Sequence, residues 1–261
     1  YYAVNDIPTT ANSNDSIVSS RVQLPQDGNI AVSSAATWFS EDFGGTLSQD
    51  WGDFDRDGDL DLLLGSSRTT TIYRNDDGEL NRYWTTERTA YGVRWMDIGS
   101  PNFSFVAVGA SVDGTAVTTG TNIIYTFNPN ATNAATRFLE VDTFRSDLQL
   151  IRVQPGDVNR DGWVDLVATT NAINSTCPTQ IFLHSQDPVA PYADLRSACA
   201  SNDASAAIAL GDADNDGDLD LASGRFASQD ATLLFNNALN TGVIFTDTNS
   251  VSIETRLSFL P

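Results

Sequence analysis

Short runs of apolar residues, separated by turn-forming residues, recur along the chain and predict β-strands. Leucines stand at every second position over 60–64, and the apolar positions repeat in the same way over 164–166 and 219–221. An Asp-Gly pair at 77–78 lies between two further strand-like runs, which is typical of a β-hairpin. No segment carries an apolar period of 3.6 residues with capping residues. The pattern therefore predicts an all-β fold.

The strand pattern belongs to an internal repeat. Residues 52–65, 156–168 and 211–224 align without gaps, and the first acids of these stretches are 104 and 55 residues apart. Because the first interval is about twice the second, a further copy is expected midway. Residues 97–109 supply it, with the opening Asp and the closing Gly but without the acids between them. The chain thus contains four repeats, of which three are rich in Asp.

The length of the repeat predicts the architecture. A unit of about 45–60 residues with three or four short strands has the size of one β-propeller blade. We therefore predict a single repeat domain over 1–261, a propeller of four to five blades that either closes by itself or forms part of a larger one. The expected division is a partial N-terminal blade at 1–50, followed by blades at about 51–95, 96–154, 155–209 and 210–261.

The charge of the chain is strongly negative, with 34 acidic and 14 basic residues and a net charge of −20. Such a surface repels nucleic acids and anionic lipids, so both are excluded as partners. No run of about 18 apolar residues predicts a membrane span. Thirteen of the acids lie in three nine-residue segments, 53–61, 157–165 and 212–220. Crowded carboxylates repel one another unless a cation neutralises them.

The spacing Asp-x-Asp-x-Asp-Gly-x-x-Asp suits calcium, which binds six to eight oxygen ligands. Positions 1, 3, 5 and 9 offer side-chain oxygens, position 7 offers a backbone carbonyl, and Gly at position 6 permits a sharp turn with positive φ. Zinc prefers His and Cys, which these loops lack. We therefore predict three Ca²⁺ sites. Their ligands are Asp53, Asp55, Asp57 and Asp61 with the Asp59 carbonyl; Asp157, Asn159, Asp161 and Asp165 with the Trp163 carbonyl; and Asp212, Asp214, Asp216 and Asp220 with the Asp218 carbonyl.

Two alternatives exist for these loops. An EF-hand needs Glu at position 12, where this chain has Leu64, Ala168 and Ser223, so that interpretation fails. An Asp-rich surface turn that holds no ion would explain a single loop. Three copies in register favour calcium.

The three motifs, together with residues 105–110 (Phe-Val-Ala-Val-Gly-Ala), resemble the FG-GAP/VCBS repeat family, which includes the propeller of integrin α-subunits and many bacterial surface proteins. The resemblance covers most of 45–250. It implies a propeller with calcium in loops at the blade edge, where the ion stabilises the repeat and does not act on a substrate. Seven blades are usual in the integrin relatives, and this chain is too short for seven.

Two cysteines, Cys177 and Cys199, are expected to form a disulfide in an extracellular chain, secreted or on the cell surface, the alternative being two free thiols. The leading functional hypothesis is a calcium-stabilised module for binding, adhesion or self-assembly. Its partner would be a protein or glycan at the cell surface or matrix, or a second copy of the chain.

Two other functions were considered. In a lectin-like propeller, exposed aromatic residues would stack on sugars, whereas the alternative is that they pack between blades; these residues are Trp38, Trp51, Trp84, Tyr91 and Trp95. A polysaccharide lyase or hydrolase would need a catalytic set. The single histidine, His184, is interpreted as a surface residue, and no nucleophile elbow or phosphate-binding loop is present. The sequence therefore predicts no enzyme and no catalytic residues.

Overall fold

The protein is described from a computed structural model. The described residues are 2–4, 18–20, 22–23, 31–32, 38–40, 44–98, 102–110, 121–146, 148–170, 176–187, 191–192, 198–201, 205–225, 230–236, 245 and 251–254. This part of the chain contains strands and one 3-10 turn, Ala134–Thr136, but no α-helix. The predicted all-β class is confirmed.

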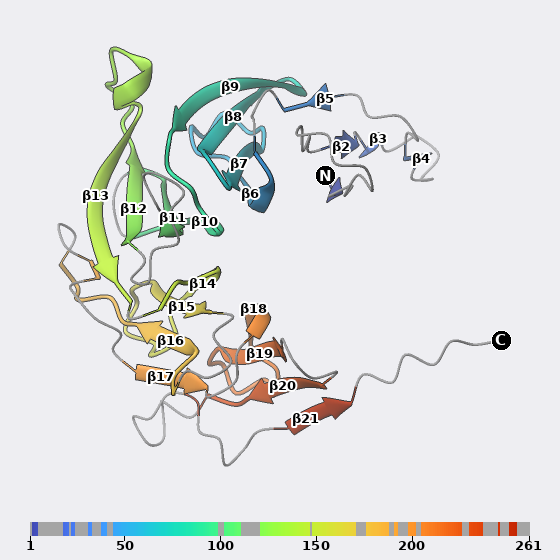
Figure 1. Cartoon of the computed structure of the whole chain (residues 1–261), viewed down its shortest axis with the longest axis vertical. Helices are drawn as coiled ribbons and strands as arrows, with labels where there is room; N and C mark the ends of the chain where they lie inside the picture. The colour runs from blue at the N-terminus through green and yellow to red at the C-terminus, as the bar shows by residue number, and fades with distance from the viewer. Residues whose placement is uncertain are drawn as a thin grey trace.

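Four antiparallel sheets of four strands each follow one another along the chain (Figure 1), and within each sheet every strand pairs with the next in sequence. The first sheet contains β6 (Thr46–Gly52), β7 (Asp61–Ser66), β8 (Thr70–Asp76) and β9 (Glu79–Thr86). The second contains β10 (Gly92–Met96), β11 (Ser104–Ala110), β12 (Thr121–Phe127) and β13 (Phe138–Arg145). The third contains β14 (Arg152–Gly156), β15 (Asp165–Thr169), β16 (Thr179–Phe182) and β17 (Ala198–Ser201). The fourth contains β18 (Ser205–Gly211), β19 (Asp220–Arg225), β20 (Asp230–Leu234) and β21 (Val251–Glu254).

Shorter strands precede the first sheet. β1 (Tyr2–Val4), β2 (Val18–Ser20) and β5 (Trp38–Phe39) form one small sheet, and β3 (Val22–Gln23) pairs with β4 (Ala31–Val32). Trp38 of β5 connects this region to the first sheet, because its indole N–H donates to the carbonyl of Leu80 at 3.0 Å.

The four sheets are arranged along an arc (Figure 1), and their first strands β6, β10, β14 and β18 lie side by side in that order. Each sheet begins several residues before the boundary expected from its loop, because the strand that precedes the loop belongs to the same sheet. β10, for instance, starts at Gly92, ahead of the expected boundary at 96.

Successive sheets pack face to face and bury their apolar residues between them. Phe54, Ile72 and Trp84 of the first sheet and its loop share a core with Trp95 and Phe105 of the second. Further cores lie between the second and third sheets and between the third and fourth. β7 is buried along its whole length, because its leucines pack in the first of these cores on one face and in a separate apolar cluster around Tyr73 on the other.

The hairpin between β8 and β9 has a two-residue turn at Asp77 and Gly78, with φ of 55° and 92°. Positive φ at both central residues is the type I′ geometry that matches the twist of the paired strands. The hairpin predicted from the Asp-Gly pair is confirmed.

The last residue of the strand before each Asp-rich loop is a glycine, and two of these glycines meet the following sheet. A Cβ added at Gly52 would lie 2.7 Å from Cδ1 of Trp95, and one added at Gly156 would lie 2.7 Å from Cδ1 of Leu210. At Gly211, in the fourth sheet, none of the described residues lies within 4 Å of this position. Close sheet packing therefore requires glycine in the first and third sheets, and not in the fourth.

Candidate metal-binding loops

Each Asp-rich loop joins the first and second strands of its sheet. The glycine before the loop pairs across the sheet with the ninth loop residue: Gly52 with Asp61, Gly156 with Asp165, and Gly211 with Asp220. The three loops therefore occupy the same place in the first, third and fourth sheets, and the same position numbers can be used for all of them.

The backbone of the loops turns sharply at two positions. The glycines at position 6, Gly58, Gly162 and Gly217, have φ of 98°, 90° and 93°, which confirms the expected role of glycine. The fourth residue is also left-handed in each loop, with φ of 63° at Arg56, 59° at Arg160 and 63° at Asn215. Sequence reasoning missed this second turn, because arginine rarely adopts positive φ and only Asn215 gives a signal for it.

Carboxylates at positions 1 and 5 hold the loop closed by accepting backbone hydrogen bonds. Asp53 accepts from the N–H of Asp57 through Oδ1 at 3.1 Å and from that of Gly58 through Oδ2 at 3.0 Å. Asp157 and Asp212 accept the same pair of bonds in their own loops. The carboxylate at position 5 accepts in turn from the N–H at position 7 in all three loops.

The carboxylate at position 9 is buried beneath the loop and bridges two backbone segments. Asp61 accepts from the N–H of Phe54 at 3.1 Å and from that of Asn75, at the far end of the sheet's third strand, at 2.9 Å. Asp165 and Asp220 repeat both bonds at 2.7–3.1 Å. Burial raises the pKa of Asp61 to about 7 and that of Asp165 to about 6, although these N–H bonds oppose the rise.

The donors to position 9 that lie at or just after the end of the third strand, here called the anchor residues, are Asn75, His184 and Asn236. The Asn75 amide also donates to the carbonyl of Leu60 at 3.1 Å, and the Asn236 amide donates to that of Leu219 at the same distance. His184 is buried in this position, so its interpretation as a surface residue is wrong. Its ring stacks on Trp163 with centroids 4.6 Å apart. Sequence reasoning missed this group, since its spacing from the loop varies.

The second sheet lacks such a site in the residues that the structure describes, which exclude 99–101 of its loop. Met96 pairs with Ser104, so a serine stands where the ninth Asp stands in the other sheets. The Ser104 hydroxyl is buried 2.8 Å from that of Thr126 on β12. A neutral hydroxyl pair thus replaces the buried carboxylate, and Asp97 is exposed. The degenerate repeat thus keeps the pairing of its first two strands but has no buried carboxylate at this position.

The residues of the first and third loops fit a hard cation. Oxygens of Asp53, Asp55 and Asp61 lie within 4.8 Å of one another, and those of Asp212, Asp214 and Asp216 do so in the third loop. Oδ1 of Asp55 is buried and has no hydrogen-bond partner within the described part of the chain. Burial, and then the charge of Asp57, raise the pKa of Asp55. A carboxylate oxygen without a hydrogen-bond donor, with other carboxylates around it, is the kind of group that a hard cation such as Ca²⁺ binds.

The second loop differs because Asn159 replaces an acid at position 3. Its amide donates to Oδ2 of Asp161 at 3.2 Å, and its carbonyl oxygen accepts from the Asp161 N–H at 3.0 Å. Asp161 also accepts from the side chain of Gln186 at 3.3 Å. The predicted ligands of this loop therefore lie close together, but they form more hydrogen bonds with one another than the ligands of the first loop do.

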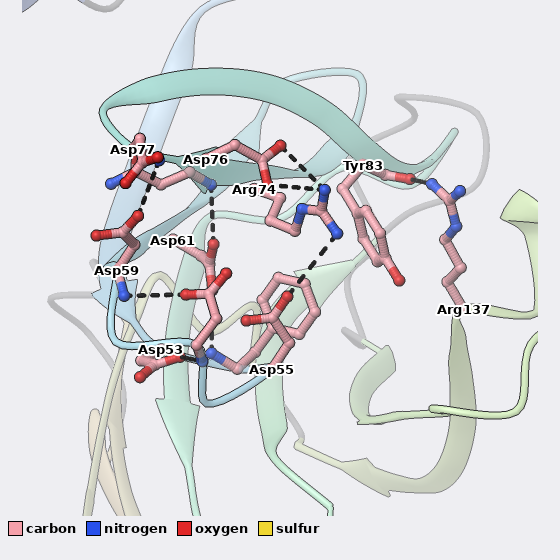
Figure 2. Close-up of polar contacts among 12 residues, drawn as sticks. Asp53, Asp55, Asp59, Asp61, Arg74, Asp76, Asp77, Tyr83 and Arg137 are labelled. Atoms are coloured by element: carbon pink, nitrogen blue, oxygen red, sulfur yellow. Dashed lines mark hydrogen bonds and ion pairs between the residues drawn. The ribbon is translucent and has the colours of Figure 1, made fainter.

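A guanidinium group lies beside the first loop (Figure 2). Arg74, on β8 next to the anchor Asn75, forms an ion pair with Asp76 at 2.8 Å and reaches Oδ2 of Asp55 at 4.0 Å. Its Cζ lies 5.5 Å from the centroid of the Tyr83 ring, while Cζ of Arg137 lies 4.0 Å from the same ring. Arg137 also donates to the Tyr83 carbonyl. A predicted ligand of the first loop is thus already in contact with a positive charge.

The other predicted residues are placed as follows. Trp84 and Trp95 are buried in the core between the first two sheets, and Trp38 packs edge-on against Tyr73 with centroids 4.8 Å apart. Cys177 is buried and disulfide-bonded, and Cys199 is the only other cysteine of the chain. In the part of the chain that the structure describes, no helix is long and apolar enough to cross a membrane.

Comparisons with known proteins add little to this description. No protein-family model matches the sequence, and no curated protein matches it. Thirty-two chains of solved structures match the fold. One belongs to the Chaetomium thermophilum Polycomb Repressive Complex 2 bound to GSK126, with 9% identity and a TM-score of 0.48 over 94% of this chain and 52% of that one. The protein thus spans about half the length of that chain.

Proposed function

We propose that this protein is a calcium-stabilised β-propeller module of the FG-GAP/VCBS type. The observation that carries the proposal is the repetition of one hydrogen-bonded loop, with its buried ninth carboxylate, at the same place in three sheets. Four sheets that pack face to face along an arc, with their first strands adjacent, support the propeller assignment (Figure 1).

Calcium would be held by the predicted residues at positions 1, 3, 5 and 9 and by the carbonyl at position 7 of each loop. Its chemical contribution is to neutralise carboxylates that repel one another. The chain's own hydrogen bonds already curl each loop, so the side chains are arranged before the cation binds. Since the ninth carboxylate also connects the loop to the third strand, cation binding would stabilise the whole sheet.

We further propose that the module acts outside the cell, without catalysis, in binding, adhesion or self-assembly. The loops serve the fold in this proposal, and the partner would bind elsewhere on the surface. The burial of Trp84 and Trp95 removes two of the five aromatic residues that a lectin would present to a sugar. This observation favours a general binding module over sugar recognition by those residues.

The test is thermal unfolding of the protein freed of metal on a chelating resin, with and without calcium. The calcium concentration is about 1 mM, in the range of the dissociation constants of extracellular calcium-binding modules. We expect calcium to raise the midpoint by several degrees or more, and magnesium at the same concentration to raise it less. The matched variant Asp53→Asn, Asp157→Asn, Asp212→Asn should lose most of this increase. An unchanged midpoint in the wild-type protein would refute the proposal.

A further inference from the structure

The side chain at position 7 has a different environment in each loop. In the first loop, Asp59 Oδ2 accepts a hydrogen bond from the N–H of Asp77 at 2.9 Å, so this carboxylate is turned toward the β8–β9 turn (Figure 2). In the second loop, the Trp163 ring stacks on His184. In both, the side chain has a partner inside the sheet, and the carbonyl is the group that the motif offers to a cation.

Asp218, at position 7 of the third loop, has no such partner. The residue is 1% exposed, and among the residues that the structure describes neither of its buried carboxylate oxygens has a hydrogen-bond donor. A buried carboxylate without a donor is strongly destabilising unless it is protonated or neutralised by a cation. The surrounding acids make this worse, because the side chain that interacts with the Asp218 carboxylate is another carboxylate, that of Asp216, and Asp220 and Asp214 add their negative charges.

The other side chains near the loop do not neutralise the buried carboxylate of Asp218. Position 4 is Asn215 here, whereas the other two loops have arginine. The guanidinium of Arg160, from the second loop, lies near Gly217, with Nη1 3.4 Å from an added Cβ, but forms no hydrogen bond with Asp218. The third loop thus places five carboxylates in nine residues, one of them fully buried and unpartnered.

We infer that the side-chain carboxylate of Asp218 takes part in cation binding at the third loop, and that this makes the third loop the tightest of the three sites. The inference rests on the proposed calcium binding and adds to it, since position 7 otherwise contributes only its carbonyl. The ligand would be a divalent cation with a preference for oxygen, because every side chain available is a carboxylate.

The experiment is a calorimetric titration of the metal-free full chain with Ca²⁺, comparing Asp218→Asn with the matched control Asp59→Asn. Both variants change one position-7 carboxylate to an amide. We expect Asp218→Asn to weaken the tightest site about tenfold or more. The same variant should unfold at a higher temperature without metal, since it removes an unpartnered buried charge. Asp59→Asn should leave the tightest site within about twofold of wild type.

Two results would overturn the inference, and they differ in meaning. If the wild type binds calcium and Asp218→Asn binds it with the same affinities, Asp218 is only a protonated buried acid, and the proposed function stands. If the wild type binds no calcium, both proposals fail. Circular dichroism tests whether Asp218→Asn folds. If it does not, Asp218→Ser, which also removes the carboxylate but has a smaller side chain, is titrated in its place, and the same two results would overturn the inference.

Discussion

Asp61 accepts a hydrogen bond from the backbone N–H of Asn75 at 2.9 Å, and this contact connects the first Asp-rich loop to the third strand of its sheet. The side chain of Asn75 strengthens the connection from the other direction, because its amide donates to Leu60 and its Oδ1 accepts from the N–H of Gly78 at 2.7 Å. One residue therefore joins the loop, the strand and the following turn.

Removing that side chain should destabilise the protein even without metal. Asn75 is buried, so Asn75→Ala leaves the Leu60 carbonyl and the Gly78 N–H without partners. We expect a loss of about 1–3 kcal/mol in the free energy of unfolding, measured by urea denaturation of the metal-free protein. Asn81→Ala on β9 is the control, since Asn81 is exposed and makes only a 3.4 Å contact with Glu79. Equal losses in the two variants would contradict the role given to Asn75.

The buried carboxylates predict how stability depends on pH. Burial raises the pKa of Asp61 to about 7 and that of Asp165 to about 6, against about 3.9 for Asp in an unfolded chain. Between these values the folded protein binds more protons than the unfolded one, so metal-free stability falls as pH rises. We expect the thermal midpoint of the metal-free protein to be higher at pH 5 than at pH 8.

Calcium should reverse this slope. The cation binds the ionised carboxylates, so its stabilising effect grows as they lose their protons. In saturating calcium the midpoint at pH 8 should therefore equal or exceed that at pH 5. The same melts, run with and without calcium at each pH, measure both slopes. A metal-free midpoint that rises from pH 5 to pH 8 would be inconsistent with the burial of Asp61 and Asp165.

The loops themselves could be predicted from the sequence because their determinants are local. Gly58 and its two counterparts turn with positive φ as expected, and the ninth Asp begins a strand in all three copies. The anchor residues could not be found in this way. They lie 14, 19 and 16 residues beyond the ninth Asp, and their type changes from Asn75 to His184 to Asn236. Their shared property is a backbone N–H, which the identity of the side chain does not reveal.

The differences between the loops are also nonlocal. Asp59 and Asp218 occupy the same motif position, but one has a partner from the β8–β9 turn and the other has none. The sequence predicted equal roles for them because it shows only the motif. The succession of small sheets along the chain was predicted from the repeat length, whereas the packing of Gly52 against Trp95 depends on how two sheets meet.

The packing of the sheets predicts a graded effect of Gly-to-Ala substitution. A methyl group at Gly52 would meet the buried Trp95 ring, and one at Gly156 would meet the half-buried Leu210, which has more freedom to move. We expect Gly52→Ala to cost about 1–3 kcal/mol, Gly156→Ala to cost less, and Gly211→Ala to stay within about 0.5 kcal/mol of wild type. Urea denaturation in calcium measures all three. A large loss in Gly211→Ala would mean that the fourth sheet is also tightly covered at this position.

Arg74 should weaken cation binding at the first loop. It lies 4.0 Å from Asp55, the predicted ligand with the unpartnered oxygen, whereas Leu183 and Phe235 precede the anchor residues of the other two loops. A partly exposed ion pair of this kind contributes about 0.5–1 kcal/mol, so Arg74→Leu should tighten one calcium site about two- to fivefold.

The same substitution should lower stability in the absence of metal, because Asp55 and Asp76 lose the positive charge between them. Arg74→Lys, which keeps the charge, is the control and should change the affinity less. Calorimetric calcium titrations and metal-free melts of the two variants measure both effects. Opposite signs for affinity and metal-free stability are the signature of a side chain that competes with the cation. If Arg74→Leu weakened calcium binding, Arg74 would instead be holding the loop in its binding conformation.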